Sequence, residues 1–313
     1  MASKTEGASR YYYRGDSVVY PYEEGSASSN NVFTYFAGGA GYQVATPRLA
    51  ATVMLLRDAP DGGGGPQDDA SEGAAQPLDQ QDGEPRVFML HRVASMAFAA
   101  DAYVFPGGRV DAADSADGVP WDGPDAQEWA GVLGVEPDVA ASVVVAAARE
   151  LYEECGVLMA GDASGRVGVE RDARSLEERR MLAAHETTLA QVLADRGMRL
   201  RTDLLRPHSR WVTPVAEPRR YDTFFFKAIL PEGVQADGLT SEANEARWVR
   251  PGRILQRFED DLTLLLPPTI FHLRKLQKAG SAQAFLASAS DMSPVLSESA
   301  IVDGKAVAVC PRA

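Results

Sequence analysis

Three glutamates at helical spacing are the side chains of this sequence best suited to chemistry. Glu150, Glu153 and Glu154 are spaced i, i+3 and i+4, so on a helix they project from one side. Like charges at this spacing repel one another, and Arg149 is the neighbouring cation. Carboxylate oxygens are the ligands that hard divalent cations prefer, and Mg²⁺ is often shared between one or two carboxylates and phosphate oxygens. The pattern therefore indicates either a divalent-metal site or an ordinary solvated acidic face.

The segment over residues 138–154 is predicted to be the helix that carries these acids. Pro137 and Asp138 are typical of a helix start, alanine is abundant, and Gly156 stands where a helix end is expected. A tight turn, Pro106-Gly107-Gly108, follows a short predicted strand upstream. A glycine pair after a strand and a glycine that closes the acidic helix favour a built site over a chance cluster.

The remaining apolar patterns predict an α/β protein. Strands are expected at residues 49–56, 87–91, 102–105, 211–215, 223–230 and 246–249. Helices are expected as a pair within 175–196 broken near 185–187, over 267–278, and in a short segment to 288. Residues 111–137 are expected to form a loop, and Asp303-Gly304 is expected to turn a hairpin.

Composition bounds the class of protein. The chain has 313 residues, 45% of them hydrophobic, and a formal charge of −13. This fraction supports a real core, and the acidic balance argues against a nucleic-acid partner. Two cysteines are too few for a disulfide framework, and no apolar run reaches the length of a signal peptide or a membrane span. We therefore expect a cytoplasmic protein without a membrane partner.

Two further motifs make the glutamates part of a known pattern. The run from Arg149 to Val157, Arg-Glu-Leu-Tyr-Glu-Glu-Cys-Gly-Val, is similar to the second half of the Nudix hydrolase box. The run Phe-Pro-Gly-Gly-Arg-Val-Asp over 105–111 resembles its first half. Two departures stand out: Asp114 replaces a glutamate, and residues 115–148 form a spacer much longer than the family's.

An interrupted box resembles one branch of the family, the coenzyme A diphosphatase-like proteins related to the peroxisomal enzyme. Trp-Val-Thr-Pro over 211–214 and Pro-Arg-Arg-Tyr-Asp-Thr over 218–223 are similar to segments of that branch. The resemblance implies a Nudix α/β/α sandwich with a mixed sheet, enlarged by a helical cap.

On this basis we expect one Nudix domain over residues 47–313 after an irregular N-terminal extension over 1–46. Within the domain we expect three additions, which are a flexible acidic loop over 58–85, a box insertion over 115–141 and a helical insertion over 161–210. The oligomeric state is left open.

The resemblance also implies roles for the box residues. The carbonyl of Gly107 and the side chains of Glu150, Glu153 and Glu154 are expected to hold Mg²⁺ or Mn²⁺, and the three glutamates to serve catalysis. Arg149 is expected to orient the carboxylates rather than to touch the substrate.

Further site residues are expected outside the box. A general base is expected at Glu242, a position six residues before Trp248 that the resemblance favours over Glu245. Arg219 and Arg220 are candidates for binding phosphate by bidentate guanidinium contacts, or else they form a solvated basic turn or internal salt bridges. Arg92 is a further candidate for the substrate. The four histidines, His91, His185, His208 and His272, lack metal-ligand spacing and are interpreted as structural.

The function expected from the resemblance is metal-dependent hydrolysis of the diphosphate linkage in a nucleoside diphosphate derivative. Coenzyme A or an acyl-coenzyme A is the leading substrate, and NADH or a nucleotide sugar is the alternative. A Nudix-derived regulatory module that binds a nucleotide without cleaving it is the alternative from another class. Intact helical glutamates favour the enzyme.

Overall fold

The computed structural model describes residues 11–37, 43–58, 84–93, 101–240 and 243–312. The chain separates into two compact units. The larger comprises residues 49–210 and 223–293, and the smaller comprises residues 1–48, 211–222 and 294–313. The acidic loop expected over 58–85 lies almost entirely outside the described residues.

A mixed sheet organises the larger unit, with the strand order β13-β5-β4-β3-β11-β10-β14. β12 pairs with β4, and β6 pairs with β3. β12 with β4, β3 with β4, β3 with β6 and β4 with β5 pair antiparallel, whereas β13 and β5 run parallel. The strands of this sheet are β3 (Arg48–Asp58), β4 (Pro85–Arg92), β5 (Ala102–Val104), β6 (Gly107–Arg109), β10 (Arg206–Val212), β11 (Tyr221–Ile229), β12 (Ala243–Val249), β13 (Leu264–Leu265) and β14 (Asp291–Leu296). All six strands expected from the sequence are confirmed, with boundaries shifted by a few residues.

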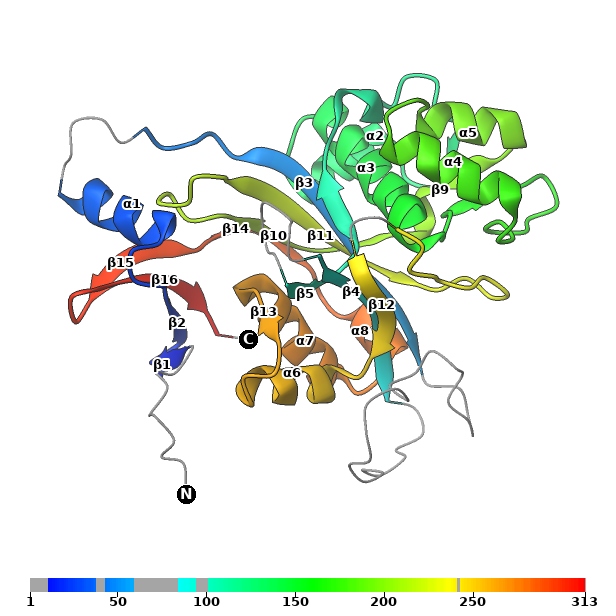
Figure 1. The fold of residues 1–313 in the computed structure, drawn as a ribbon. Helices are drawn as coiled ribbons and strands as arrows, with labels where there is room; N and C mark the ends of the chain where they lie inside the picture. Colours follow the sequence, from blue (N-terminus) through cyan, green and yellow to red (C-terminus); the bar gives the residue numbers. More distant parts are fainter. Residues whose placement is uncertain (1–10, 38–42, 59–83, 94–100, 241–242, 313) are drawn as a thin grey trace. The chain divides into compact units, whose positions relative to one another are not determined.

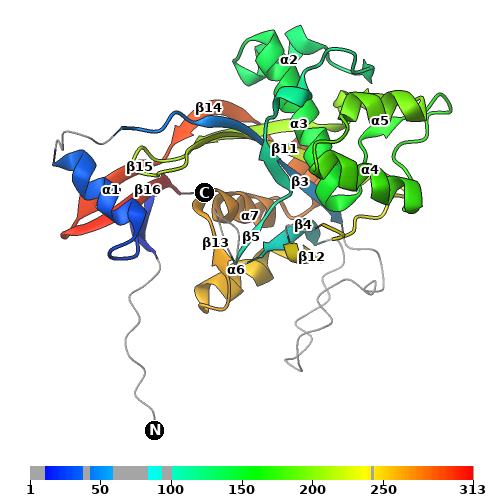
Figure 2. The ribbon, with the colours of Figure 1, turned by 45° about the horizontal axis from the view of Figure 1, so that its top comes forward.

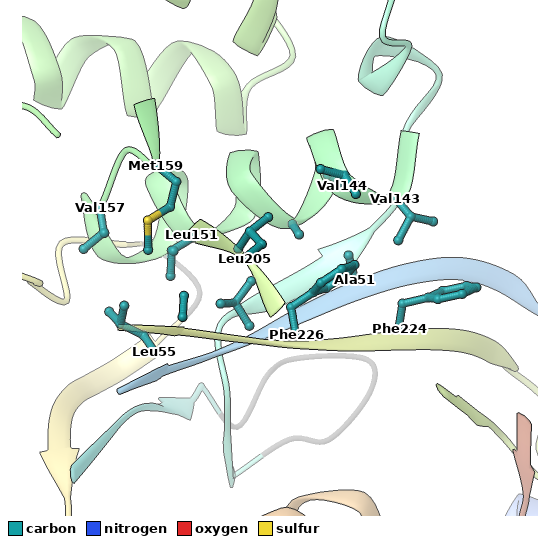
Figure 3. Close-up of a cluster of buried hydrophobic side chains, with 14 of the residues drawn as sticks. Ala51, Leu55, Val143, Val144, Leu151, Val157, Met159, Leu205, Phe224 and Phe226 are labelled. Carbon is teal, nitrogen blue, oxygen red and sulfur yellow. The ribbon is translucent and has the colours of Figure 1, made fainter. Parts of the chain in front are cut away.

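Helix α3 (Pro137–Cys155) covers one face of this sheet (Figures 1 and 3). Its start and end are as predicted, because Pro137 opens the helix and Gly156 adopts the left-handed conformation that ends it. The side chains that it packs against come from β3, β4, β11 and β12. Phe224 and Phe226 point into this core, whereas Phe225 between them contacts His272 on the opposite face.

The opposite face of the sheet carries α6 (Pro251–Glu259), α7 (Pro267–Ala279) and α8 (Ala282–Ala287), as Figures 1 and 2 show. Helices therefore lie on both sides of a mixed sheet, which confirms the predicted α/β/α architecture. The sequence analysis did not predict α6, although Pro251 opens it and its buried residues recur at helical spacing: Ile254, Leu255 and Phe258.

The segment expected to be a loop over 111–137 contains regular structure, so that prediction is wrong. A 3₁₀ turn, Ala112–Asp114, is followed by β7 (Trp121–Asp122) and helix α2 (Ala126–Leu133). The sequence does contain the signals for α2, since Asp125 and Glu128 form a capping box and Gly134 ends the helix. Trp129 and Leu133 of α2 enter the same core as α3.

The insertion over 161–210 forms a small cap of two helices, α4 (Ala173–Ala183) and α5 (Leu189–Arg196), as predicted. It also forms part of a sheet with the order β7-β9-β8, in which β8 is Ala160–Gly161 and β9 is Arg199–Arg201. Apolar residues of α5 pack with Val145, Ala148 and Tyr152 of α3. The cap thus covers the side of α3 that does not face the main sheet.

The smaller unit differs from the irregular extension expected over 1–46. Residues in this range form β1 (Tyr12–Arg14), β2 (Ser17–Pro21) and α1 (Ala27–Phe36). These strands join β15 (Glu298–Val302) and β16 (Lys305–Pro311) in a sheet with the order β1-β2-β16-β15. The pairing partners lie at the far end of the chain, which local periodicity does not reveal. The hairpin at Asp303-Gly304 is confirmed, and both of its residues have positive φ.

In the described part of the chain, no single helix is long and apolar enough to cross a membrane. Only α2 and α3 taken together pass that test, and they are bent by 92° at their junction.

Two histidines, His208 and His272, are buried where the sheet meets α7. We expect their burial to lower the free energy of unfolding at acidic pH. His208 has no hydrogen-bond partner at either ring nitrogen among the described residues, and His272 contacts Ser209 Oγ at 2.7 Å through Nε2. Burial lowers the pKa of His208 to about 2 and that of His272 to about 3. The unfolded chain binds protons near pH 6.5, so stability is full above this pH and falls as the pH drops toward 3.

Between pH 6.5 and 5.5 we expect the free energy of unfolding to fall by about 1 kcal/mol for each of these two histidines. Urea unfolding of the native protein and of His208→Leu at both pH values checks this, because the variant should lose about 1 kcal/mol less. His185→Asn, which removes an exposed histidine, is the control and should follow the native protein. Equal pH dependence in the native protein and His208→Leu would contradict the prediction.

Candidate active site

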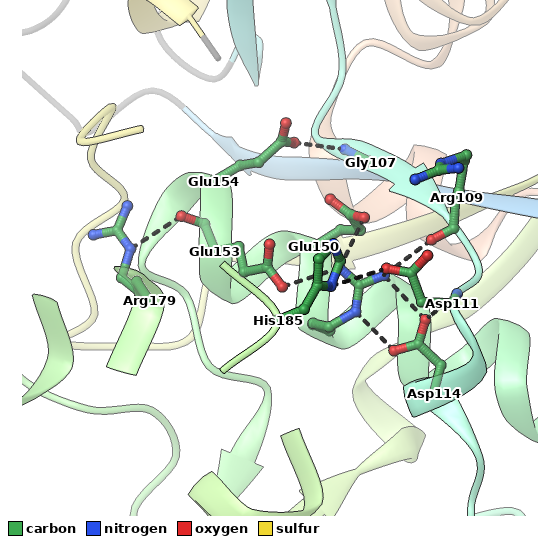
Figure 4. A network of polar contacts seen from close by, with 10 residues as sticks. Gly107, Arg109, Asp111, Asp114, Glu150, Glu153, Glu154, Arg179 and His185 are labelled. Atoms are coloured by element: carbon green, nitrogen blue, oxygen red, sulfur yellow. Dashed lines mark hydrogen bonds and ion pairs between the residues drawn. The ribbon is translucent and has the colours of Figure 1, made fainter. Parts of the chain in front are cut away.

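Arg149 lies at the centre of the acidic face of α3 and uses every one of its N–H groups (Figure 4). Its Nε and one Nη grip the Asp114 carboxylate at 2.7 and 3.0 Å. The other Nη donates to Glu150 at 2.9 Å and to Glu153 at 3.0 Å, and the fifth bond goes to the Arg109 carbonyl. Guanidinium has five N–H groups, so Arg149 has none left for a substrate. This geometry agrees with the orienting role expected for Arg149.

Asp114 is the partner that holds this arginine, although it replaces the glutamate typical of the box. Its side chain is 1% exposed and also accepts a bond from the backbone N–H of Asp111 at 2.7 Å. Burial alone would lower the pKa of Arg149, but hydrogen bonds to Asp114 and the charges of Glu150, Asp114 and Glu153 outweigh it and raise the pKa. Arg149 therefore remains a cation in the folded protein.

The glycine turn of the box packs tightly between strand β3 and helix α3. The Gly107 N–H donates to Glu154 Oε2 at 2.7 Å. A Cβ on Gly108 would lie 2.3 Å from Glu150 Oε1, and a Cβ on Gly107 would lie 2.4 Å from the Ala51 carbonyl oxygen. Antiparallel pairing of β6 with β3 fixes the turn in this position. Glycine at both positions is thus a condition for bringing the turn against the carboxylates.

The three glutamates are largely shielded from solvent. The side chains of Glu150 and Glu153 are 12% and 11% exposed, and Glu154 is buried. Burial raises the pKa of Glu153, and the Arg149 charge and hydrogen bond partly offset this effect. Such a site is electrostatically prepared for a cation, because a positive charge would relieve both the burial and the repulsion between carboxylates.

The donor set fits a hard divalent cation in its chemistry. Carboxylate oxygens of Glu150, Glu153 and Glu154 project from one helix, and such oxygens are what Mg²⁺ and Mn²⁺ prefer. Among the described residues, however, the side chains are not gathered into a group of three or more around one point. Glu150 and Glu153 are turned to Arg149, and Glu154 is turned to Gly107. Binding of a cation would therefore require some of these side chains to rotate.

Helix α4 of the cap fixes the C-terminal end of α3. Arg179, which is buried, donates to the Glu153 carbonyl at 3.1 Å and pairs with Asp237 at 2.9 Å. The neighbouring Glu178 accepts a bond from the Tyr152 hydroxyl at 2.7 Å. The cap is thereby bonded to the helix at the turn that carries Glu153 and Glu154.

Three of the residues considered for the site lie outside the box: Glu242, Glu245 and Arg92. Glu242 lies outside the described residues, so its role as a base stays a prediction. Glu245, the alternative, accepts a bond from the Tyr103 hydroxyl and lies 3.5 Å from Arg247. Arg92 ends β4 and is half-buried.

The two candidate phosphate-binding arginines, Arg219 and Arg220, belong to the smaller unit. The Arg220 guanidinium donates to the backbone carbonyls of Thr213 and Ala45, so it has a structural role there. Of the two interpretations of these arginines, the geometry of Arg220 favours internal bonding.

Two residues near the carboxylates were missed by sequence reasoning. No sequence signal distinguishes Arg179 from the other arginines of α4, because its partners lie far away in the sequence, in α3 and in the segment 237–239. His185 follows α4, and its Nδ1 lies 3.5 Å from Asp111 Oδ2. From the sequence, all four histidines are interpreted as structural; His208 and His272 are buried, whereas His185 is exposed.

The fold and the box together define a Nudix protein, and comparison with known proteins agrees. A family model described as NUDT19 Nudix domain matches residues 125–276. The crystal structure of a Nudix hydrolase from Alicyclobacillus acidocaldarius aligns with a TM-score of 0.60 and 24% identity, covering 79% of this chain and 99% of that one. The chain thus has the fold of Nudix hydrolases, and a Nudix family model matches nearly half of its length.

Two curated proteins are similar to this chain in sequence. The chain is 28% identical over 195 residues to putative nudix hydrolase 7 of Caenorhabditis elegans, an alignment that covers 62% of this chain and 56% of that protein. It is 26% identical over 279 residues to the acyl-coenzyme A diphosphatase NUDT19 of Gallus gallus, covering 73% of this chain and 68% of that protein. The chain thus spans little more than half the length of the nematode relative.

Proposed function

We propose that this protein hydrolyses the diphosphate linkage of a nucleoside diphosphate derivative, with coenzyme A or an acyl-coenzyme A as the leading substrate. The observation that carries the proposal is the approach of Glu150 and Glu154 to the Gly107–Gly108 turn, with Glu153 held on the same helix by Arg149. Arg149 and Asp114 hold this arrangement although the box is interrupted. A protein that had lost catalysis would not need to keep all of these residues together.

In the proposed reaction the glutamates and the Gly107 carbonyl would hold Mg²⁺ or Mn²⁺. When bound, the cation would neutralise the diphosphate and make a water molecule more acidic. Arg149 orients Glu150 and Glu153, and the Gly107 N–H orients Glu154. Glu242 is proposed as the general base that takes the proton of the attacking water.

The substrate class rests on two similarities. The family model carries the name NUDT19, and the chicken relative is named an acyl-coenzyme A diphosphatase. With coenzyme A, attack of water on one phosphorus would cleave the diphosphate and release a phosphopantetheine and an adenosine bisphosphate. Arg92 and Arg219 remain proposed contacts for the substrate. The cytoplasmic location also remains a prediction.

A substrate panel tests this proposal. We expect metal-dependent product release from coenzyme A or an acyl-coenzyme A at a kcat/KM at least about tenfold above that for NADH, nucleotide sugars and dinucleoside polyphosphates. Chromatography of the products with Mg²⁺, with Mn²⁺ and with a chelator measures this. Faster turnover of another compound in the panel would assign that compound as the substrate in place of coenzyme A. Binding without turnover of any member would support the regulatory alternative instead.

A further inference from the structure

His185 belongs to the cap, and its side chain lies close to Asp111 of the box. It lies in the turn between α4 and α5, and its backbone N–H bonds to the Leu182 carbonyl at 2.9 Å. Its side chain is 66% exposed, and Nδ1 lies 3.5 Å from Asp111 Oδ2. Asp111 in turn lies 3.9 Å from Arg149, and the charge of His185 acts on Glu153. Figure 4 shows the ring among the carboxylates of the box.

The backbone of His185 adopts a conformation that few residue types favour. Its φ is +54°, a left-handed conformation that is unfavourable for a residue with a Cβ. Several other helices of the larger unit end on a glycine in this conformation: Gly134, Gly156, Gly197 and Gly280. Glycine or asparagine would serve the turn after α4 better than histidine does. The imidazole is therefore better explained by what it contacts than by the turn.

Arg149 cannot donate to an anionic substrate on this side of the site. All five N–H groups of Arg149 are used within the protein. His185 Nε2 has no partner among the described residues, whereas Nδ1 is turned to Asp111. When both ring nitrogens carry a proton, one N–H can bond to Asp111 and the other to a phosphate oxygen.

We propose that His185 is a substrate-contacting residue that binds a phosphate oxygen of the diphosphate through Nε2, while Asp111 holds Nδ1. The inference deepens the proposed function and rests on it for the identity of the substrate. It assigns the cap a direct part in binding, in addition to its bonds to α3.

The variants His185→Asn and His185→Gly test the contact, because both residues tolerate the left-handed turn and neither retains an imidazole. The probe is methylenediphosphonate, a diphosphate analogue whose P–C–P bridge water does not cleave, titrated calorimetrically into the full chain with Mg²⁺. Both variants are expected to bind it at least about tenfold more weakly, as loss of a charge-assisted hydrogen bond would give. With coenzyme A, KM should rise by a similar factor while kcat changes by less than about threefold.

Glu186→Gln, in the same turn, is the control and should bind the probe like the native protein. Unchanged affinity in both His185 variants would overturn the contact and assign the histidine to the turn alone. Native protein that does not bind the probe would also overturn it. If the His185 effect on binding is present but no substrate of the panel is cleaved, the proposed hydrolysis fails while the contact stands.

Discussion

Replacing Glu153 or Glu154 by glutamine is expected to lower kcat/KM at least about a hundredfold while the protein stays folded. Each change removes a negative charge but keeps an oxygen that can accept the bonds from Arg149 or from Gly107. The local geometry should therefore survive, and what is lost is the attraction for a divalent cation and hence for the diphosphate that it would neutralise. Steady-state kinetics with coenzyme A and Mg²⁺ measure the effect, and titration with Mn²⁺ measures cation binding directly.

Glu177→Gln provides a matched control for these two substitutions. Glu177 is an exposed glutamate of α4 that pairs with Arg180. The same change of charge there should leave both turnover and Mn²⁺ affinity unchanged. Turnover at the native level in Glu153→Gln and Glu154→Gln would show that these glutamates do not have the proposed role, whatever the substrate.

Replacing Arg149 by methionine is expected to reduce the free energy of unfolding by about 3–5 kcal/mol. The change leaves Asp114 buried without its ion-pair partner. It also removes the positive charge that offsets the repulsion between the Glu150 and Glu153 carboxylates. Chemical denaturation followed by circular dichroism measures the loss. Arg149→Met combined with Asp114→Leu should be more stable than Arg149→Met alone, because no charge is then stranded in the interior.

Arg166→Met is the comparison for this effect, since Arg166 forms an exposed i, i+4 pair with Glu170. Exposed pairs contribute little to stability, so this variant should unfold close to the native protein. An Arg149→Met variant as stable as Arg166→Met would contradict the view that Arg149 and Asp114 form a buried framework of the site.

The interrupted box illustrates why the site survives a long insertion. The insertion follows Asp114 and includes α2, whose Trp129 and Leu133 pack into the core beside α3. Packing of this kind returns the chain to the start of α3, so that Arg149 still meets Asp114 across 35 positions of sequence. The acid that departs from the family pattern thus has a partner in the described structure.

The amino-acid sequence by itself determined the acidic helix and the class of protein. The start at Pro137, the end at Gly156 and the i, i+3, i+4 spacing are local signals, because helix capping and side-chain direction depend on a few neighbouring residues. The box motif is likewise contained in two short stretches. For the same reason most strands of the main sheet, although not β6, β13 and β14, and the two helices of the cap were predicted from the sequence.

Only the tertiary structure decided which partner each charged group of the site has. The bond from Gly107 to Glu154 joins residues 47 positions apart, and Arg179 reaches Glu153 across 26 positions. The approach of His185 to Asp111 depends on how the cap folds back over α3. Such contacts are set by the packing of separate elements against one core, and spacing along the chain carries no record of it.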